Sequence, residues 1–399
     1  MKKYKNLNLK YGLVNISYLM LVCATAGYAY NYLSKNGFAD SAIGIIIASI
    51  SVCGIIGQTV FGDIIDRSQK LDEKTFISMS MLVCTALAVL LMILPEGSFL
   101  IIPVVIIGFT SASIGMPFLN SMAFIYEKEG QKINYGLGRG LGSAAYAVGS
   151  ALLGQLWASF GKGILPIYLI ALSLITFLLV RIMPTPAKDI EKVAEAEEEV
   201  EKKKQLSYGA FFKKYNKIIL IVVSLILIYF AHMIINTYMA KVIGNIINSD
   251  NVESVQGTAM FIQAMVELPT MFAFSLILKK LPINKILILA TVFYTIKHAL
   301  ILLSGNIPML YAAMVLQMLS YAALVPGSVY FANENIEPED RNKGQAIFGA
   351  TATVGGLLAS AVGGTLFSIM SVKGVLTVGL IATAVGMVLM FIGIKRIEA

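Results

Sequence analysis

Twelve long apolar stretches alternate with short polar segments along the 399 residues of the chain. Each is close to or above the roughly 20 residues that a helix needs to cross the hydrocarbon core of a bilayer. Backbone polar groups inside a bilayer must be paired within the protein, which favours helices over irregular segments. The pattern therefore predicts an all-α integral membrane protein with transmembrane helices at residues 11–33, 42–61, 75–94, 99–124, 136–160, 164–183, 218–243, 257–278, 285–304, 308–333, 346–370 and 375–394.

One charged segment, residues 184–207, divides these twelve spans into two groups of six. Its run AEAEEEVEKKK is typical of a solvated linker, because such charge density opposes burial. We predict a six-helix half at residues 1–183, a cytoplasmic linker at 184–207 and a second six-helix half at 208–399. The composition agrees, since only 14% of the residues are charged against about a quarter in soluble domains.

The positive charge is distributed unevenly between alternate loops. Of 31 Lys and Arg residues, 25 lie at the termini and in every second loop, four lie in the opposite loops and two lie within spans. Loops rich in Lys and Arg face the cytoplasm. We therefore expect a multi-pass protein of the cell membrane with both termini cytoplasmic. The net charge of +8 is explained by topology, so no nucleic-acid partner is expected.

The two groups of spans show weak internal symmetry. Spans 4 and 10 each carry a proline followed by an asparagine, Pro117 with Asn120 and Pro326 with Asn333. Spans 5 and 11 are both rich in glycine, which lets helices approach closely in lipid. Membrane transporters are often built from such repeats, with the substrate site near the midplane.

Ionisable residues within a span are costly, so each is a candidate for function. On a helix, Arg139 shares a face with Tyr135, Ser143 and Tyr146. A guanidinium offers five fixed donors, and an aromatic ring offers an apolar face with a polar tip. We predict that Arg139 and Tyr146 bind a hydroxylated solute; a structural ion pair of Arg139 is the alternative.

Glu267 is the only acidic residue deep in an apolar span. It is expected to carry a proton, to bind a ligand hydroxyl, or to pair with Lys297 or His298. His232 shares a helix face with Asn236 and is equally well explained as a structural histidine.

Further polar side chains lie along the spans at positions that can line a wet cavity or serve in packing. Trp157, late in span 5, is expected in the aromatic belt at the membrane surface. The remaining candidate substrate-binding residues are Tyr28, Asn120, Asn236 and Gln317.

The loop after span 2 reads GDIIDRSQK at residues 62–70. It resembles the loop signature of the major facilitator superfamily, although Ser68 or Gln69 replaces the usual second glycine. The resemblance implies that Asp66 and Arg67 belong to a cytoplasmic gate. Asp63, at the edge of span 2, is predicted to join them.

Three segments narrow the resemblance: GIIIASISVCGIIGQTVFGDIIDR (44–67), NYGLGRGLGS (134–143) and ELPTMFAFSLIL (267–278). They are similar to the oligosaccharide:proton symporter, or lactose permease-like, branch. The resemblance implies that Arg139 is the sugar-binding arginine and that Tyr146 replaces a tryptophan stacked on the sugar. It also implies that Glu267 binds sugar and couples to the proton, with Lys297 at the branch's ninth-span arginine.

The chain departs from this branch in spans 4 and 10. Asn120 and its neighbours leave no acid in span 4, and Gln317 and Ser320 stand where the branch has titratable groups. Proton coupling is therefore left to Glu267 with Lys297 or His298.

These observations predict a secondary transporter that works by alternating access and takes up a sugar, oligosaccharide or nucleoside-like small molecule. We expect the coupling ion to be a proton, with no further cofactor or metal, and a monomer would suffice. A multidrug or metabolite exporter of the same fold is the alternative. A membrane enzyme or sensor is a remote third, because the sequence shows no nucleotide loop, metal-ligand cluster or nucleophile–base spacing.

Overall fold

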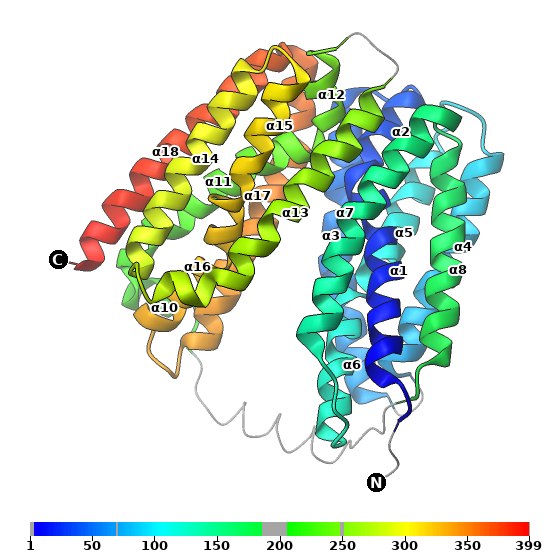
Figure 1. The fold of residues 1–399 in the computed structure, drawn as a ribbon, viewed down its shortest axis with the longest axis horizontal. Helices are drawn as coiled ribbons and strands as arrows, with labels where there is room; N and C mark the ends of the chain where they lie inside the picture. Colours follow the sequence, from blue (N-terminus) through cyan, green and yellow to red (C-terminus); the bar gives the residue numbers. More distant parts are fainter. Residues whose placement is uncertain (1–3, 69–70, 186–205, 248–250, 399) are drawn as a thin grey trace. The chain divides into compact units, whose positions relative to one another are not determined.

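The computed structural model describes residues 4–68, 71–185, 206–247 and 251–398, and all regular elements within them are helices (Figure 1). Eleven helical segments of these residues are long and apolar enough to cross a membrane. The remaining predicted span is helix α7 (Tyr135–Phe160), whose 26 residues include many glycines and Arg139, which lower its hydropathy. The predicted all-α membrane fold is thus confirmed. Most of the predicted linker, including the run AEAEEEVEKKK, lies outside the described residues.

The helices form two compact units. Unit 1 comprises Met1–Phe38 and Ser49–Lys203, and unit 2 comprises Ala39–Ala48 and Lys204–Ala399. Helix α3 (Asp40–Arg67) therefore begins in unit 2 and continues in unit 1. The other helices of unit 1 are α1 (Leu7–Gly27), α2 (Ala29–Lys35), α4 (Glu73–Ile93), α5 (Ile101–Ile114), α6 (Met116–Lys128), α7 and α8 (Ile164–Ile182). Those of unit 2 are α10 (Tyr208–Lys214), η1 (Asn216–Ile218), α11 (Ile219–Thr237), α12 (Met239–Gly244), α13 (Val252–Leu278), α14 (Ile283–Leu303), α15 (Ile307–Val315), η2 (Leu316–Met318), α16 (Tyr321–Asn335), α17 (Arg341–Ile369) and α18 (Val372–Glu398).

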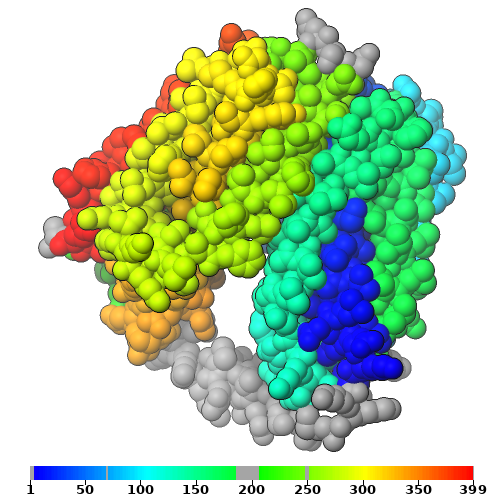
Figure 2. Space-filling model, in the orientation of Figure 1, coloured from blue at the N-terminus to red at the C-terminus, as the bar shows by residue number. Residues whose placement is uncertain are grey.

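Within unit 1, α1 lies between α7 and α8 (Figure 2), and α4 packs on α5 and α8. The last carbonyls of a helix lack intrahelical donors and need other partners. At the end of α8, Lys74 donates to the carbonyl of Met183 at 2.6 Å, and Tyr126 donates to the carbonyl of Pro184 at 2.5 Å. These bonds hold the two residues that follow α8 against α4 and α6.

Within unit 2, α11 packs on α17 and α18, and α14 packs on α18. The short helix α10 is tied to the connection between α16 and α17, because Lys214 donates to Asp340 at 2.8 Å. Tyr215 donates to the same carboxylate at 2.9 Å. The bond from Lys214 is the main cause that lowers the pKa of Asp340 below its usual range.

Four of the predicted spans are interrupted, and they are every third span. The first breaks at Tyr28 between α1 and α2, and the fourth breaks at Gly115 between α5 and α6. The seventh breaks at Tyr238 between α11 and α12, and the tenth breaks between η2 and α16, around Ser320. Discontinuous helices at matching positions of the two halves are typical of transporters built from repeats, in which the unwound backbone groups line the binding site.

The breaks at Tyr28 and Tyr238 are built in the same way. Tyr28 donates its hydroxyl to the carbonyl of Ser150 at 2.7 Å, and Tyr238 donates to that of Ser360 at 2.8 Å. Both pairs are 122 residues apart in sequence. An aromatic ring seven residues after each serine packs on the tyrosine, Trp157 in unit 1 and Phe367 in unit 2. The two halves therefore share a detailed repeat. Trp157 is 3% exposed, so the prediction of a belt residue was wrong.

This repeat predicts matched stability effects. Tyr28→Phe and Tyr238→Phe each remove one buried hydroxyl donor and leave a serine carbonyl with one bond fewer. We expect each substitution to destabilise its unit by about 1 kcal/mol, because that is typical of a buried neutral hydrogen bond. Thermal unfolding of the purified protein in detergent measures this, with Tyr208→Phe, an exposed tyrosine, as control. A cost confined to one half would contradict the repeat.

Residues 39–48, at the start of α3, are held on unit 2 by an ion pair and by close backbone packing. Asp40 accepts from Lys241 of α12. A Cβ atom placed on Gly44 would lie 2.3 Å from the carbonyl oxygen of Ser360 and 3.0 Å from the Cα of Gly364. Only glycine allows backbones to approach this closely.

Gly44→Leu is therefore expected to separate residues 39–48 from α17. Gly54→Leu, in the same helix, is the matched control, because a Cβ there meets nothing within 4 Å. The measurement is the yield of a short thiol cross-link between cysteines placed at positions 40 and 241. We expect a high yield with Gly54→Leu and at least a tenfold lower yield with Gly44→Leu; equal yields would contradict the packing argument.

Candidate functional site

A chain of three side chains in unit 2 joins α13, η2 and α14. Lys297 donates to Oε1 of Gln317, and Nε2 of Gln317 donates to Oε1 of Glu267 at 2.8 Å. Lys297 and Gln317 are each 1% exposed, whereas Glu267 is half-buried. The chain exists because the tenth span breaks here: Gln317 lies in the short 3-10 turn η2, just before Ser320. Pro269, inside α13, lies two residues after Glu267.

A second chain connects α11 to α13. Nε2 of His232 lies 2.7 Å from Nδ2 of Asn236, and Nε2 of Gln263 donates to Oδ1 of Asn236 at 3.1 Å. His232 also stacks on Tyr321, with ring centroids 5.0 Å apart. Gln263 precedes Glu267 by four residues, so both lie on one face of α13. Oε1 of Gln263 is buried with no partner among the described residues.

His298 lies beside Lys297 but faces another direction. Its Nδ1 lies 2.9 Å from the carbonyl oxygen of Tyr294. Because a carbonyl only accepts, Nδ1 carries the hydrogen, and Nε2 is left as an acceptor. That Nε2 and the hydroxyl of Tyr294 are buried without a partner in the described part of the chain. Unit 2 thus holds unsatisfied polar groups next to the Glu267 chain, which a ligand or water can satisfy.

In unit 1, Arg139 lies near the first turn of α7, against the start of α1. The adjacent Gly138 admits the ring of Tyr11, since a Cβ atom there would lie 2.5 Å from it. Nη1 of Arg139, the hydroxyl of Tyr11 and Oδ1 of Asn15 are each buried with no hydrogen-bond partner among the described residues. The structure shows no ion pair of Arg139 with a described carboxylate within 4 Å. A guanidinium with an unused buried donor is suited to a hydroxyl or an anionic oxygen.

The deciding comparison covers most of the chain. A model of the MFS_1 like family matches residues 13–378. The chain belongs to the MFS_1 like family. It is thus a membrane transporter of the MFS type, and such proteins are not enzymes.

Solved structures support the same fold. A mutant of the nucleoside transporter NupG superposes with a TM-score of 0.80 at 16% identity, over 99% of this chain and 100% of that one. A bacterial homologue of the iron transporter ferroportin, inward-facing, gives 0.75 at 12% identity over 99% and 100%. A mutant of the peptide transporter POT with alafosfalin gives 0.68 at 15% identity over 98% and 94%. A comparison with curated protein sequences finds no match. At these identities the structural matches show the fold of this MFS_1 like protein and not its substrate.

The remaining predicted site residues of this MFS_1 like chain differ in their surroundings. Tyr28 is fully buried and bonded to Ser150, so in this conformation it serves the packing of unit 1. Tyr146 and Asn120 are half-buried, and Oδ1 of Asn120 is buried without a partner among described residues. Roles of these side chains in binding stay predictions.

The predicted gating residues lie at the end of α3. Asp63, Asp66 and Arg67 are all exposed. The basic residue that completes the loop signature, Lys70, lies outside the described residues. Gating by this loop stays a prediction.

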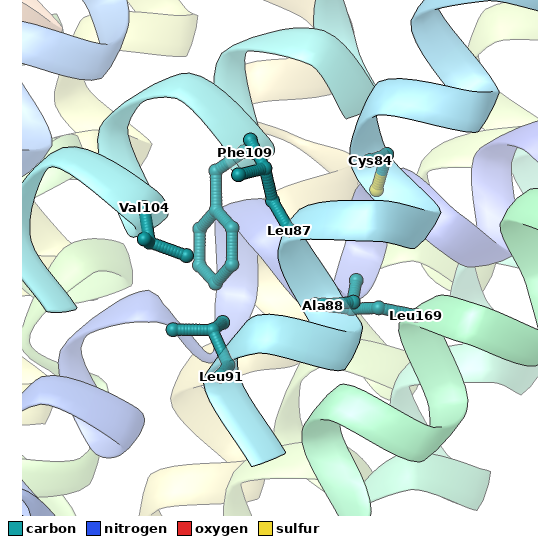
Figure 3. A pocket seen from close by; sticks show the side chains of 8 residues that line it. Cys84, Leu87, Ala88, Leu91, Val104, Phe109 and Leu169 are labelled. Atoms are coloured by element: carbon teal, nitrogen blue, oxygen red, sulfur yellow. The ribbon is translucent and has the colours of Figure 1, made fainter. Parts of the chain in front are cut away.

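Unit 1 also contains an apolar pocket. It is lined by Cys84, Leu87, Ala88, Leu91, Val104, Gly108, Phe109 and Leu169 (Figure 3). Its side chains come from α4, α5 and α8 and are apolar apart from the thiol. It offers no group to orient a polar solute, so we do not assign it to the transport site. No cluster of three or more His, Cys, Asp or Glu side chains suited to a metal ion occurs in the described ranges.

Proposed function

We propose that this MFS_1 like protein is a secondary active transporter that takes up a polyhydroxylated solute, a nucleoside or a sugar, together with protons. Uptake follows alternating access, with the protein a monomer in the cell membrane and both termini cytoplasmic. The observation that supports this most directly is the chain Glu267–Gln317–Lys297, a carboxylate and an ammonium linked inside membrane-spanning segments. Ionisable groups at such depth mark substrate and ion pathways.

Each unit contributes groups of the chemistry that a hydroxylated solute requires. Arg139 provides an unused donor, and Tyr146 provides an aromatic face. Glu267 and Gln263 provide acceptors one helical turn apart on α13. Hydroxyl groups both donate and accept, so either set is suited to a sugar or to the ribose of a nucleoside. The similarity in fold to a nucleoside transporter makes nucleosides the first class to test.

The test is thermal stabilisation of the purified protein by nucleosides, mono- and disaccharides and lipophilic cations, followed by uptake into proteoliposomes. A solute that binds the folded state raises its apparent stability by mass action. Stabilisation by uridine, adenosine or a sugar, with uptake driven by an inward proton gradient, supports the proposal. Stabilisation by lipophilic cations alone, with outward transport, supports the exporter instead.

A further inference from the structure

Gln317 links two charged groups that do not contact each other directly. Lys297 and Glu267 are both bonded to its amide, and no N–O distance of 4.0 Å or less joins the two described residues directly. All three lie on different elements, α14, η2 and α13. The amide is therefore the only hydrogen-bonded link between the ammonium and the carboxylate within the described chain.

The direction of the amide follows from the chemistry of its neighbours. An ammonium only donates, and an ionised carboxylate only accepts. Gln317 must therefore turn its oxygen to Lys297 and its nitrogen to Glu267, as the structure has it. Neither an apolar side chain nor a second carboxylate at position 317 can make both bonds.

The described central turns of the other long helices of unit 2 carry no Asp, Glu, Lys or Arg. The titratable side chains nearest this chain are Tyr229 and His232 from α11, Tyr294 and His298 from α14, and Tyr321 from α16, whereas Tyr311 and Tyr330 contact α13 at Val255 and Phe274. His232 is bonded to Asn236, and His298 donates to the Tyr294 carbonyl. Helices α15, α17 and α18 place no Asp, Glu, Lys or Arg in their central turns. Among the described residues of unit 2, Lys297 is thus the cation linked to Glu267, and it acts across the amide of Gln317.

We propose that Gln317 is a positioning residue: it holds the Lys297 ammonium one amide away from Glu267 and so sets the pH at which Glu267 takes up the coupling proton. An ammonium in direct contact with a carboxylate keeps that carboxylate ionised. When the ammonium is removed, burial favours the protonated carboxylic acid. With the amide between them, the attraction of Lys297 for Glu267 is weaker than in direct contact but is not lost, because Coulomb energy falls with distance. On this inference, which rests on the proposed function, the proton comes from solvent and binds a carboxylate oxygen of Glu267, while Lys297 keeps its bond to Gln317.

The test measures protonation without using transport. Infrared difference spectra of purified protein in proteoliposomes, recorded along a pH titration, report the carboxylic acid band of Glu267. Glu267→Gln identifies that band by removing it. The variants are Gln317→Leu, Lys297→Met and the double variant. If Gln317 acts through Lys297, the two single substitutions move the midpoint of the band to higher pH, each by at least tenfold in proton concentration.

The double variant separates positioning from a merely structural role. Effects of residues that act through one another are not additive. We expect Gln317→Leu to shift the midpoint at least about threefold less in proton concentration when Lys297 is already Met, the remaining shift being the lost N–H donor to Glu267. An unchanged midpoint in Gln317→Leu, or the same shift in both backgrounds, overturns the inference. Where Gln317→Leu fails to fold, Gln317→Met gives the same comparison.

The same experiment distinguishes this inference from the proposed function. If the Glu267 band titrates and the shifts of the two substitutions are additive, Gln317 has no positioning role, and proton-coupled uptake is not contradicted. If the Gln317→Leu shift depends on Lys297 but the protein accumulates none of the tested solutes, the role of Gln317 is supported and the proposed transport is contradicted.

Discussion

Glu267→Gln is expected to abolish accumulation of the solute against its gradient while leaving exchange of labelled for unlabelled solute intact. Gln keeps the size and hydrogen-bonding geometry of the carboxyl group but cannot bind or release a proton. Exchange needs only binding and reorientation, and a Gln side chain keeps one acceptor for the solute, so exchange should persist. Accumulation needs the proton, so the internal concentration should rise only to the external one. The two assays are run in proteoliposomes with and without an inward proton gradient.

Glu253→Gln is the matched control for this experiment. Glu253 is a buried glutamate of the same helix, at the first turn of α13. It has no part in the Glu267–Gln317–Lys297 chain, so its substitution should preserve gradient-driven accumulation. Full accumulation by Glu267→Gln would show that another group carries the proton, and loss of both accumulation and exchange would assign Glu267 to binding or folding alone.

The course of the helices could be predicted because the bilayer imposes a simple rule on the sequence. Long apolar runs recur wherever a span exists, and even α7 was predicted, although its glycines and Arg139 lower its hydropathy. The interruptions of the spans follow a different logic. Pro117, at the first turn of α6, accounts for the break at Gly115, because proline cannot donate to the preceding turn.

The breaks at Tyr28 and Tyr238 have no such local signal. Each depends on a hydroxyl that reaches a serine carbonyl 122 residues further on. A contact between distant segments leaves no period in the sequence, so only the structure shows it. It also explains why Tyr28, predicted to line a cavity, lies fully buried.

The candidate site could be predicted residue by residue but not as a connected chain. The sequence indicated that Glu267 would pair with Lys297 or His298, because these are the ionisable groups of neighbouring spans. In the structure, the amide of Gln317 lies between Glu267 and Lys297. This arrangement depends on the turn η2 and not on any sequence motif. Gln263 was missed, although its spacing of four residues from Glu267 puts both on one face of α13.

Arg139→Ala is expected to weaken binding of the solute about 100-fold or more, because a hydrogen bond to a charged group contributes about 1.5–3 kcal/mol and the guanidinium can make two. Arg139→Lys should cost about tenfold, since it keeps the charge but loses the rigid pair of donors. The buried Nη1 without a partner carries the expectation: a donor already used within the protein would contribute little to a ligand. The measurement is solute-induced thermal stabilisation over a concentration series.

Arg181→Ala provides the control for charge in unit 1, because Arg181 is exposed at the last turn of α8 and should leave affinity unchanged. Two readouts distinguish binding from folding. Arg139→Ala should unfold without solute at nearly the parent temperature, because the parent Nη1 makes no bond within the described protein that could be lost. A large fall in that temperature with unaltered affinity would instead assign Arg139 to the structure of unit 1.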